Sequence, residues 1–167
     1  MSAIPISWVW WAEFMPENGE RLLGGRFTMS MDAKGRLALP ASLREQLGDA
    51  LDRPLWITNG DRCLEIYPHD EWEAFVRRVQ AMPPKAQLTR EIMIYYVSAA
   101  QPITLDKAGR ILVPPSLREE AGLRGEVVVV GMSQTIEIYN AEVFRQVFSR
   151  SRENFAANIS GMSEPLK

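Results

Sequence analysis

The chain of 167 residues has a formal net charge of −2, so its overall charge lacks the strongly basic signature of many nucleic-acid-binding domains. Its length allows one compact domain or two small ones, with enough apolar residues for a hydrophobic core. Cys63 is the only cysteine, which excludes an internal disulfide and fits a reducing compartment. No apolar run approaches the length of a membrane span, so no membrane partner is expected.

Residues 1–20 precede the patterned part of the chain and are expected to form an N-terminal extension. Residues 4–12 are apolar and contain three of the five tryptophans, but they lack a basic n-region and Glu13 follows them. A secretory signal is therefore not indicated. Because a free tail with three tryptophans would be adhesive, this segment either packs on the body of the protein or is an extension of little structural weight.

From residue 21 onwards, the residue pattern predicts alternating strands and short helices. Strands are expected where polar and apolar residues alternate between turn-forming residues, at 26–31, 36–39, 55–58, 63–67, 101–105, 111–113, 126–130 and 135–139. Helices are expected where apolar residues recur at helical spacing, at 42–47, 70–82, 86–100, 115–121 and around 144–148. The chain turns polar after about residue 149, and its end is expected to be a loose tail.

A fourteen-residue stretch occurs twice in the chain. Residues 32–45 and 106–119 are identical at eight of fourteen positions, which indicates a true internal repeat. Glu65-Ile66-Tyr67 also recurs, as residues 137–139. Each copy therefore predicts the order β-β-α-β-β-α around one shared core. The expected parts are repeat 1 at 21–82, a linker and helix at 83–100, repeat 2 at 101–155 and a tail at 156–167.

Each copy contains a tight turn that ends in an arginine. Asp32 can accept backbone N–H bonds at the start of the first turn, and Gly35 can supply a positive φ near its end. Asp106 and Gly109 have the same positions in the second turn. These four residues are expected to shape the turns.

The arginines of these turns, Arg36 and Arg110, allow two interpretations. Each could pair with the aspartate and only support the turn, or it could be held in place for two-point binding of phosphate or guanine. Lys34 would add attraction for phosphate, whereas the second copy has Lys107 one position earlier, so the two turns need not be equivalent. The residues alone leave both interpretations open with about equal weight.

The surroundings of both turns are locally basic. Residues 21–44 carry five arginine or lysine residues against Asp32 alone, and residues 104–118 carry three against Asp106. This segregation could leave a basic face on an acidic protein. Charge alone, however, favours the plainer interpretation of ordinary mixed surface charge.

No group of residues indicates an enzyme. His69 is the only histidine, and Cys63 lies in a strand pattern where a small buried apolar group is expected. No spacing of ligand residues is typical of a metal site, and neither turn glycine belongs to a Gly-rich phosphate loop. No catalytic, metal or cofactor-binding residues, and no cofactor, are therefore expected.

The repeated stretches resemble the MraZ family of bacterial transcriptional regulators. The matching residues are the signatures 32–36 and 106–110, the segments 36–44 and 110–118 that follow them, Leu64 to Pro68, and Glu71-Trp72. The resemblance covers roughly residues 22–155. It implies an α+β fold in which two AbrB-like repeats form one pseudo-two-fold swapped-hairpin β-barrel with peripheral helices.

The resemblance also implies a function. Members of the family bind double-stranded DNA at repeated short sites in the promoter of the division and cell-wall gene cluster, as ring-shaped oligomers in the cytoplasm with the nucleoid. The match places the DNA contact at Arg36 and Arg110, with Lys34 and Lys107 beside them. The N-terminal extension departs from the family, whose members usually begin near the position of Leu22.

Two other functions remain open at this point. A swapped-hairpin ring could instead bind a protein and regulate a partner enzyme, because a fold does not fix a function. A bare scaffold is the third alternative, in which Asp32 and Arg36 would matter only for stability.

Overall fold

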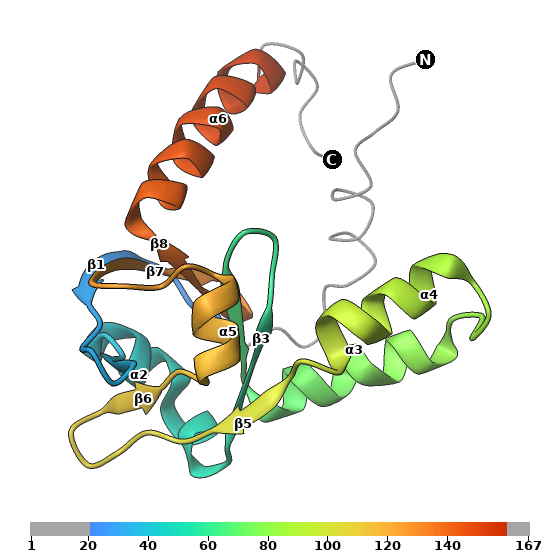
Figure 1. Cartoon of the computed structure of the whole chain (residues 1–167), viewed down its shortest axis with the longest axis horizontal. Coiled ribbons are helices and arrows are strands. Elements are labelled where there is room, and N and C mark those ends of the chain that lie inside the picture. The colour runs from blue at the N-terminus through green and yellow to red at the C-terminus, as the bar shows by residue number, and fades with distance from the viewer. Residues whose placement is uncertain (1–20, 160–167) are drawn as a thin grey trace.

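The computed structural model describes residues 21–159, so the expected N-terminal extension and the end of the expected tail lie outside the described residues (Figure 1). The described part has a mixed α+β fold. Its strands are β1 Arg26–Ser30, β2 Arg36–Ala38, β3 Leu55–Asn59, β4 Leu64–Tyr67, β5 Gln101–Ile103, β6 Arg110–Leu112, β7 Glu126–Met132 and β8 Thr135–Asn140. Its α-helices are α2 Ala41–Leu47, α3 His69–Ala81, α4 Gln87–Ile92, α5 Pro115–Glu120 and α6 Ala141–Ile159. A 3-10 turn at Gly48–Asp52 follows α2, and a π-helical turn at Met93–Val97 continues α4.

Helices α2 and α5 occupy equivalent places in the two repeats, and their bounds follow from local sequence. A proline precedes the first turn of each helix, where no intrahelical N–H bond is lost. Leu43 and Leu47 face the core from α2, and Gly48 ends the helix with a φ of 53°. These are the boundaries that the alternation of apolar and turn-forming residues predicts.

The strands that follow the two signature turns are exchanged between the repeats. β2 does not continue into a ladder with β1; it pairs with β6, so that Leu37 lies opposite Ile111. β1 in turn pairs with β7 from the second repeat. Two backbone hydrogen bonds also join each repeat to the signature turn of the other. Leu39 N–H donates to Gly109 O at 3.0 Å, and Val113 N–H donates to Gly35 O at 2.9 Å. Neither repeat can therefore complete its own core.

The expected closure into a β-barrel was wrong. The described strands form a six-stranded antiparallel sheet in the order β1-β7-β8-β4-β3-β5 and a separate two-stranded ribbon of β2 and β6. β2 and β6 have three residues each and pair only with one another within the described chain. β1 and β5 are therefore the opposite edges of an open sheet.

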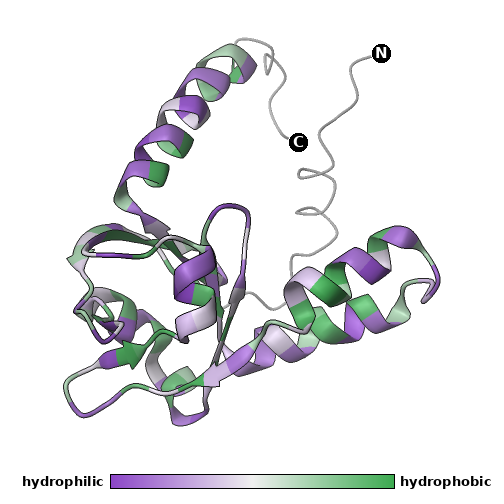
Figure 2. Ribbon diagram, in the orientation of Figure 1, coloured by the Kyte–Doolittle hydropathy of each residue, from purple (hydrophilic) through white to green (hydrophobic). Residues whose placement is uncertain are grey.

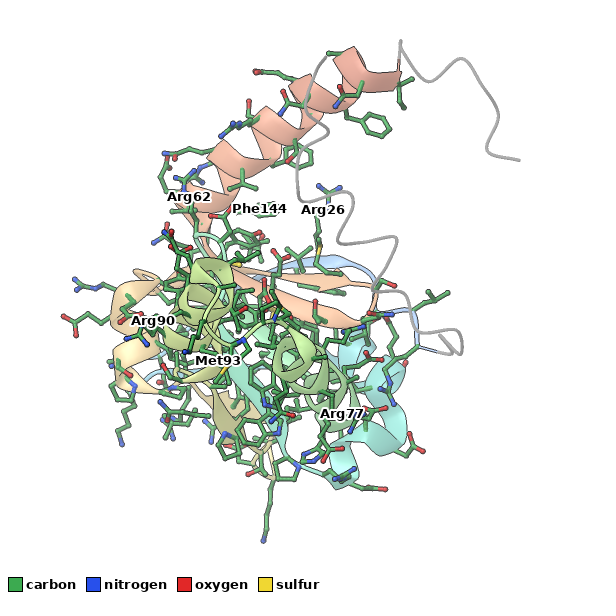
Figure 3. The ribbon with its side chains drawn as sticks, turned by 90° about the vertical axis from the view of Figure 1, so that its right-hand side faces the viewer. Arg26, Arg62, Arg77, Arg90, Met93 and Phe144 are labelled. Atoms are coloured by element: carbon green, nitrogen blue, oxygen red, sulfur yellow. The ribbon has the colours of Figure 1, made fainter. Side chains whose placement is uncertain are left out.

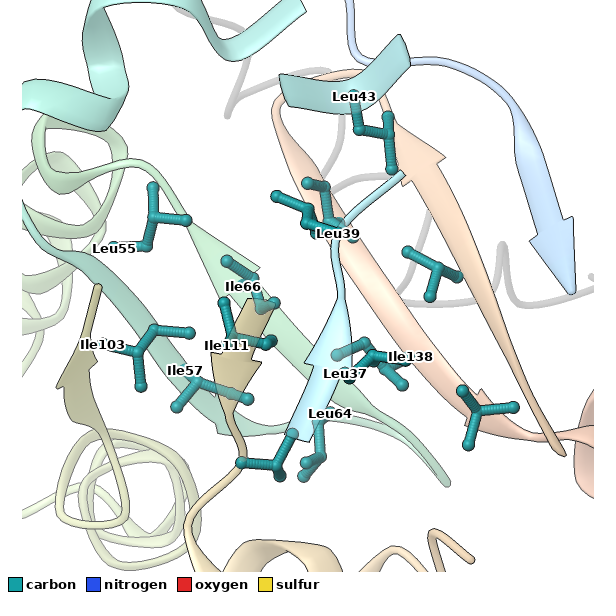
Figure 4. Close-up of a cluster of buried hydrophobic side chains, with 14 of the residues drawn as sticks. Leu37, Leu39, Leu43, Leu55, Ile57, Leu64, Ile66, Ile103, Ile111 and Ile138 are labelled. Atoms are coloured by element: carbon teal, nitrogen blue, oxygen red, sulfur yellow. The ribbon is translucent and has the colours of Figure 1, made fainter. Parts of the chain in front are cut away.

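One hydrophobic core lies between the ribbon and the six-stranded sheet. Figure 4 shows side chains of both repeats meeting there, among them Leu37, Ile111 and Ile138, all completely buried. Burial of such aliphatic side chains is the main favourable contribution to folding. The pseudo-two-fold fold is therefore held by a single core to which both repeats contribute.

Two smaller clusters attach the outer helices. Trp72, Phe75 and Val79 of α3 pack with aromatic residues of β3, β4 and the α4 region. Phe144, at the base of α6, packs on Tyr139 of β8 (Figure 3).

Beyond this base, α6 projects from the body and carries both hydrophilic and hydrophobic residues (Figures 1 and 2). It continues to Ile159, past residue 155 where the sequence placed the end of repeat 2. In the described part of the chain, no helix combines the length and the apolar character needed to cross a membrane.

Candidate nucleic-acid interface

The first signature turn is organised by one carboxylate. Asp32 Oδ1 accepts the backbone N–H groups of Lys34 and Arg36 at 3.0 and 2.9 Å, and Asp32 Oδ2 accepts Arg36 Nε–H at 2.6 Å. Backbone bonds between Asp32 and Arg36 and between Gly35 and Asp32, each 3.0 Å, close the turn. The aspartate therefore shapes the backbone and orients the arginine at the same time.

The second turn repeats this geometry. Asp106 Oδ1 accepts the N–H groups of Ala108 and Arg110 at 2.9 and 3.0 Å, and Asp106 Oδ2 accepts Arg110 Nε–H at 2.9 Å. In the first turn the carboxylate accepts the backbone N–H of Lys34. In the second turn it accepts the N–H of Ala108, and Lys107 lies one position earlier. The backbone of the two turns is thus equivalent, whereas their lysines are placed differently.

The hydrogen bonds lower the pKa of both aspartates. For Asp32 the main cause is the bond from the Arg36 backbone, and for Asp106 it is the bond from the Arg110 backbone. Each bond favours the charged carboxylate, so the aspartates stay ionised at neutral pH and keep the arginines paired. Any stability from these bonds is present at neutral pH and is lost as the pH falls through the lowered pKa values.

Both arginines keep their terminal nitrogens available. The ion pairs use only Nε of Arg36 and Nε of Arg110, and among the described residues nothing bonds Nη1 or Nη2 of either side chain. The two side chains are 38% and 37% exposed. A guanidinium held this way can still offer two N–H donors to a phosphate or a guanine edge. Turn support and ligand binding are therefore compatible roles.

Each turn is also touched by an arginine from the other repeat. Gly35 and Gly109 have φ values of 84° and 75°, which favour glycine. A Cβ at Gly35 would lie 2.5 Å from Arg118 Nη1 of α5, and one at Gly109 would lie 2.7 Å from Arg44 Nη1 of α2. The glycines thus provide the backbone conformation and leave room for a guanidinium.

Arg44 and Arg118 were not predicted from the sequence to belong to the candidate site. Both belong to the repeated fourteen-residue stretch, where they occupy identical positions, and this repetition was the sequence signal that could have identified them. Their placement depends on the exchange of β2 and β6, because each helix lies beside the opposite repeat's turn. The structure therefore brings a basic side chain of each repeat to the turn of the other, with Arg118 beside Ala33 and Gly35 of the first turn, and Arg44 beside Gly109 of the second.

A second polar cluster lies at the centre of the large sheet, away from the turns. β4 and β8 pair so that Glu65 lies directly opposite Glu137, and Cys63 Sγ lies within 4.8 Å of both carboxylates. Tyr67 donates to Glu65 at 3.1 Å, and Tyr139 donates to Glu137. The repeated Glu-Ile-Tyr sequence was the only signal of this cluster, because its members meet through strand pairing.

Burial decides the protonation of this cluster. Desolvation, reinforced by the charge of Glu137, raises the pKa of Glu65 to about 8, and desolvation also raises the pKa of Glu137. Cys63, buried as expected, has its thiol pKa raised by the same cause. A metal ion needs deprotonated ligands. These three groups are the nearest approach to a ligand set in the described chain, and burial raises the pKa of each, which disfavours the deprotonated state that a metal needs.

Stability is expected to fall with rising pH because of Glu65. A folded pKa of about 8 lies above the ordinary value of 4.5, so this group stabilises the fold fully below 4.5 and loses that contribution as the pH rises towards 8. The loss is about 1 kcal/mol per pH unit. Glu65→Gln should flatten this dependence, because the amide keeps the shape without the charge. Urea unfolding at several pH values between 5 and 8.5 measures both slopes.

The matched control for this measurement is Glu153→Gln, which changes an exposed carboxyl on α6. It should unfold with the same pH dependence as the unmodified protein. Parallel slopes for all three proteins would contradict a buried, protonated Glu65.

The exchanged strands, the pseudo-two-fold axis and the two aspartate-held arginine turns define a swapped-hairpin protein of the AbrB-like class. The family model described as "MraZ protein, putative antitoxin-like" matches residues 22–94 and 97–163. The chain therefore belongs to the MraZ family, as the sequence resemblance indicated.

Curated relatives agree with this assignment. A "Transcriptional regulator MraZ" of Limosilactobacillus reuteri is 38% identical over 135 residues, covering 80% of this chain and 92% of the relative. A protein of the same name from Burkholderia mallei is 38% identical over 144 residues, covering 86% and 95%. These names describe regulators rather than enzymes, consistent with the expectation that the chain is not an enzyme.

Proposed function

We propose that this protein is a sequence-specific DNA-binding regulator of transcription. The observation that carries the proposal is the β2–β6 ribbon, which displays Arg36 and Arg110 in two equivalent turns whose aspartates leave the terminal guanidinium nitrogens available. A two-stranded ribbon fits the major groove of B-DNA, where arginine recognises guanine O6 and N7 in two-point fashion. Lys34, Lys107, Arg44 and Arg118 add the charge that phosphate contacts need.

The acidic net charge is compatible with this role, because only the surface that faces DNA must be basic. The acidic cluster of Glu65 and Glu137 is buried in the large sheet, not in the turns. Burial raises the pKa of Glu65 to about 8, so this carboxyl adds little negative charge near neutral pH, and burial raises the pKa of Glu137 as well. Local charge at the ribbon, rather than the sum over the chain, sets the attraction for DNA.

A single subunit offers too few contacts for a tight site. One bidentate arginine–guanine contact contributes about 1–3 kcal/mol of discrimination. A ring of several subunits would present the ribbon repeatedly, and binding of the first site would raise the effective concentration at the next. We therefore include in the proposal a homo-oligomeric ring acting on repeated sites in the division and cell-wall cluster promoter, in the cytoplasm with the nucleoid.

An alternative function is a protein-interaction ring that regulates a partner enzyme. The observation that favours it is the exposed apolar surface of α6, where Phe148, Phe155 and Ile159 remain 41–65% exposed. The same surface would serve self-association in the leading proposal. The presence or absence of salt-sensitive DNA binding distinguishes the two functions.

Fluorescence anisotropy tests the proposed function. A labelled duplex carrying the proposed promoter region should bind at least about tenfold tighter than a shuffled duplex of the same composition. Between 50 and 200 mM salt, the affinity should fall by about 10³-fold or more, because several phosphates are contacted together. Equal affinity for both duplexes, or binding that salt does not weaken, would contradict a sequence-specific DNA-binding role.

A further inference from the structure

A cavity of about 660 Å³ lies between α3, the α4 region, β4 and the β7–β8 hairpin. Its size is typical of a binding site for a substantial ligand. The walls are mostly apolar and aromatic, and are formed by Phe75, Leu88, Ile92, Tyr95 and Tyr96. Leu88 and Tyr95 are 47% and 55% exposed, so apolar surface is left uncovered by the described chain.

The charged groups that line the cavity are mostly acidic. Glu65 and Glu137 line it from the sheet, Glu71 and Glu91 from the helices, and Arg78 is the one basic residue among its lining residues. Carboxyl oxygens accept hydrogen bonds, and the excess of acidic over basic side chains disfavours an acidic occupant. The cavity therefore fits an occupant that is large, apolar, free of acidic groups and able to donate N–H bonds.

The segment of residues 4–12, which lies outside the described residues, has this chemistry. It contains Trp8, Trp10 and Trp11 among aliphatic residues and no charged side chain. Each indole combines a large apolar surface with a single N–H donor. The first acidic residue, Glu13, comes directly after the segment.

The described chain begins beside the cavity. Leu23 and Ser133 exchange two backbone hydrogen bonds of 2.7 Å, and Ser133 lines the cavity. Arg21 pairs with Asp70 at 3.5 Å, next to the lining residue Glu71. The eight residues 13–20 can span up to about 28 Å when extended. Residues 4–12 can thus reach the cavity of their own chain.

We infer that residues 4–12 of this chain bind in this cavity, with indole rings against the aromatic walls and an indole N–H donating to the Glu65–Glu137 carboxyls. The tryptophans then cover the apolar surface of α3 and the α4 region. The extension becomes part of the packed body rather than an adhesive tail. This inference does not depend on DNA binding, because the cavity is separate from the two signature turns.

Cross-linking of the full-length chain tests the inference. In a Cys63→Ser background, cysteines replace Ser7 and the cavity residue Gln134, and a short bismaleimide should join them within one chain. Leu88→Asp places a charge on the cavity wall and should reduce this cross-link about tenfold or more. Ile94→Asp is the matched control, because Ile94 is 60% exposed nearby in the same helical region but does not line the cavity.

Two outcomes would overturn the inference. Equal cross-linking in the Leu88→Asp and Ile94→Asp proteins would mean that the two cysteines meet by random encounter and that the segment does not bind in the cavity. A covalent dimer in place of the intrachain product would assign the cavity to the segment of a second copy.

A second measurement keeps Cys63 and needs no cross-linker. Replacing all three tryptophans of residues 4–12 by serine in the full-length chain should increase hydrogen exchange several-fold in α4 and in Met93–Val97. These elements form one wall of the cavity. Unchanged exchange would show that the segment does not cover this wall.

Discussion

Replacing both signature arginines, Arg36→Ala together with Arg110→Ala, is expected to abolish specific DNA binding while the protein stays folded. Each arginine can contribute about 1–3 kcal/mol of base discrimination, so losing both should weaken specific binding at least about 30-fold. The fold should tolerate the change, because both side chains are more than a third exposed and their ion pairs with aspartate are screened by solvent. Anisotropy titration and a thermal melt measure the two effects separately.

A charge-matched control separates recognition from general attraction. Arg77→Ala with Arg90→Ala removes the same charge from α3 and α4, where both residues are exposed (Figure 3). This variant should keep its preference for the specific duplex. If both double variants lose the same affinity, the turns have no special role and only the total charge matters.

Lysine substitutions provide a further test of the turn geometry. Arg36→Lys with Arg110→Lys keeps the charge but loses the planar fork, so it should retain salt-sensitive, non-specific binding and lose the sequence preference. A fully specific lysine variant would contradict two-point recognition by the guanidinium groups.

Local features of the fold were predictable from the sequence because their causes are local. The signature turns follow from an aspartate and a glycine at fixed spacing, and the structure contains these turns with the expected hydrogen bonds. The short helices follow from proline before and glycine after an apolar pair. The repeat itself was visible as sequence identity, which explains why the order of elements was also predictable.

The pairing between distant strands was harder to predict from the sequence. Leu37 would be buried equally well whether β2 paired with β1 or with β6, so residue patterns could not choose, and only the family resemblance implied exchange. The same resemblance led to the wrong expectation of a closed barrel. The Glu65–Glu137 contact and the crossing of Arg44 and Arg118 to the opposite turns depend on this pairing. Sequence periodicity does not contain that information.

The largest loss of stability is expected from Ile111→Ala. Ile111 is completely buried on β6, directly opposite Leu37 of β2. Its truncation removes buried apolar surface and leaves a cavity in the shared core, which costs about 2–5 kcal/mol. The adjacent Leu112 is 57% exposed on the same strand, so Leu112→Ala should change the free energy of unfolding by no more than about 0.5 kcal/mol. Urea unfolding at one fixed protein concentration compares the two variants.

A double-mutant cycle extends this comparison to the exchange of strands. Leu37→Ala and Ile111→Ala change side chains in different repeats, and in this structure the two positions are register partners. Residues in contact show coupling energies of about 0.5–3 kcal/mol, whereas distant residues are additive within about 0.5 kcal/mol. A coupling energy of about 0.5–3 kcal/mol between these two positions is therefore expected, as for neighbouring residues in one core. Additive effects would mean that each repeat folds around its own hairpin, and the arginines of the two turns would then not share one ribbon.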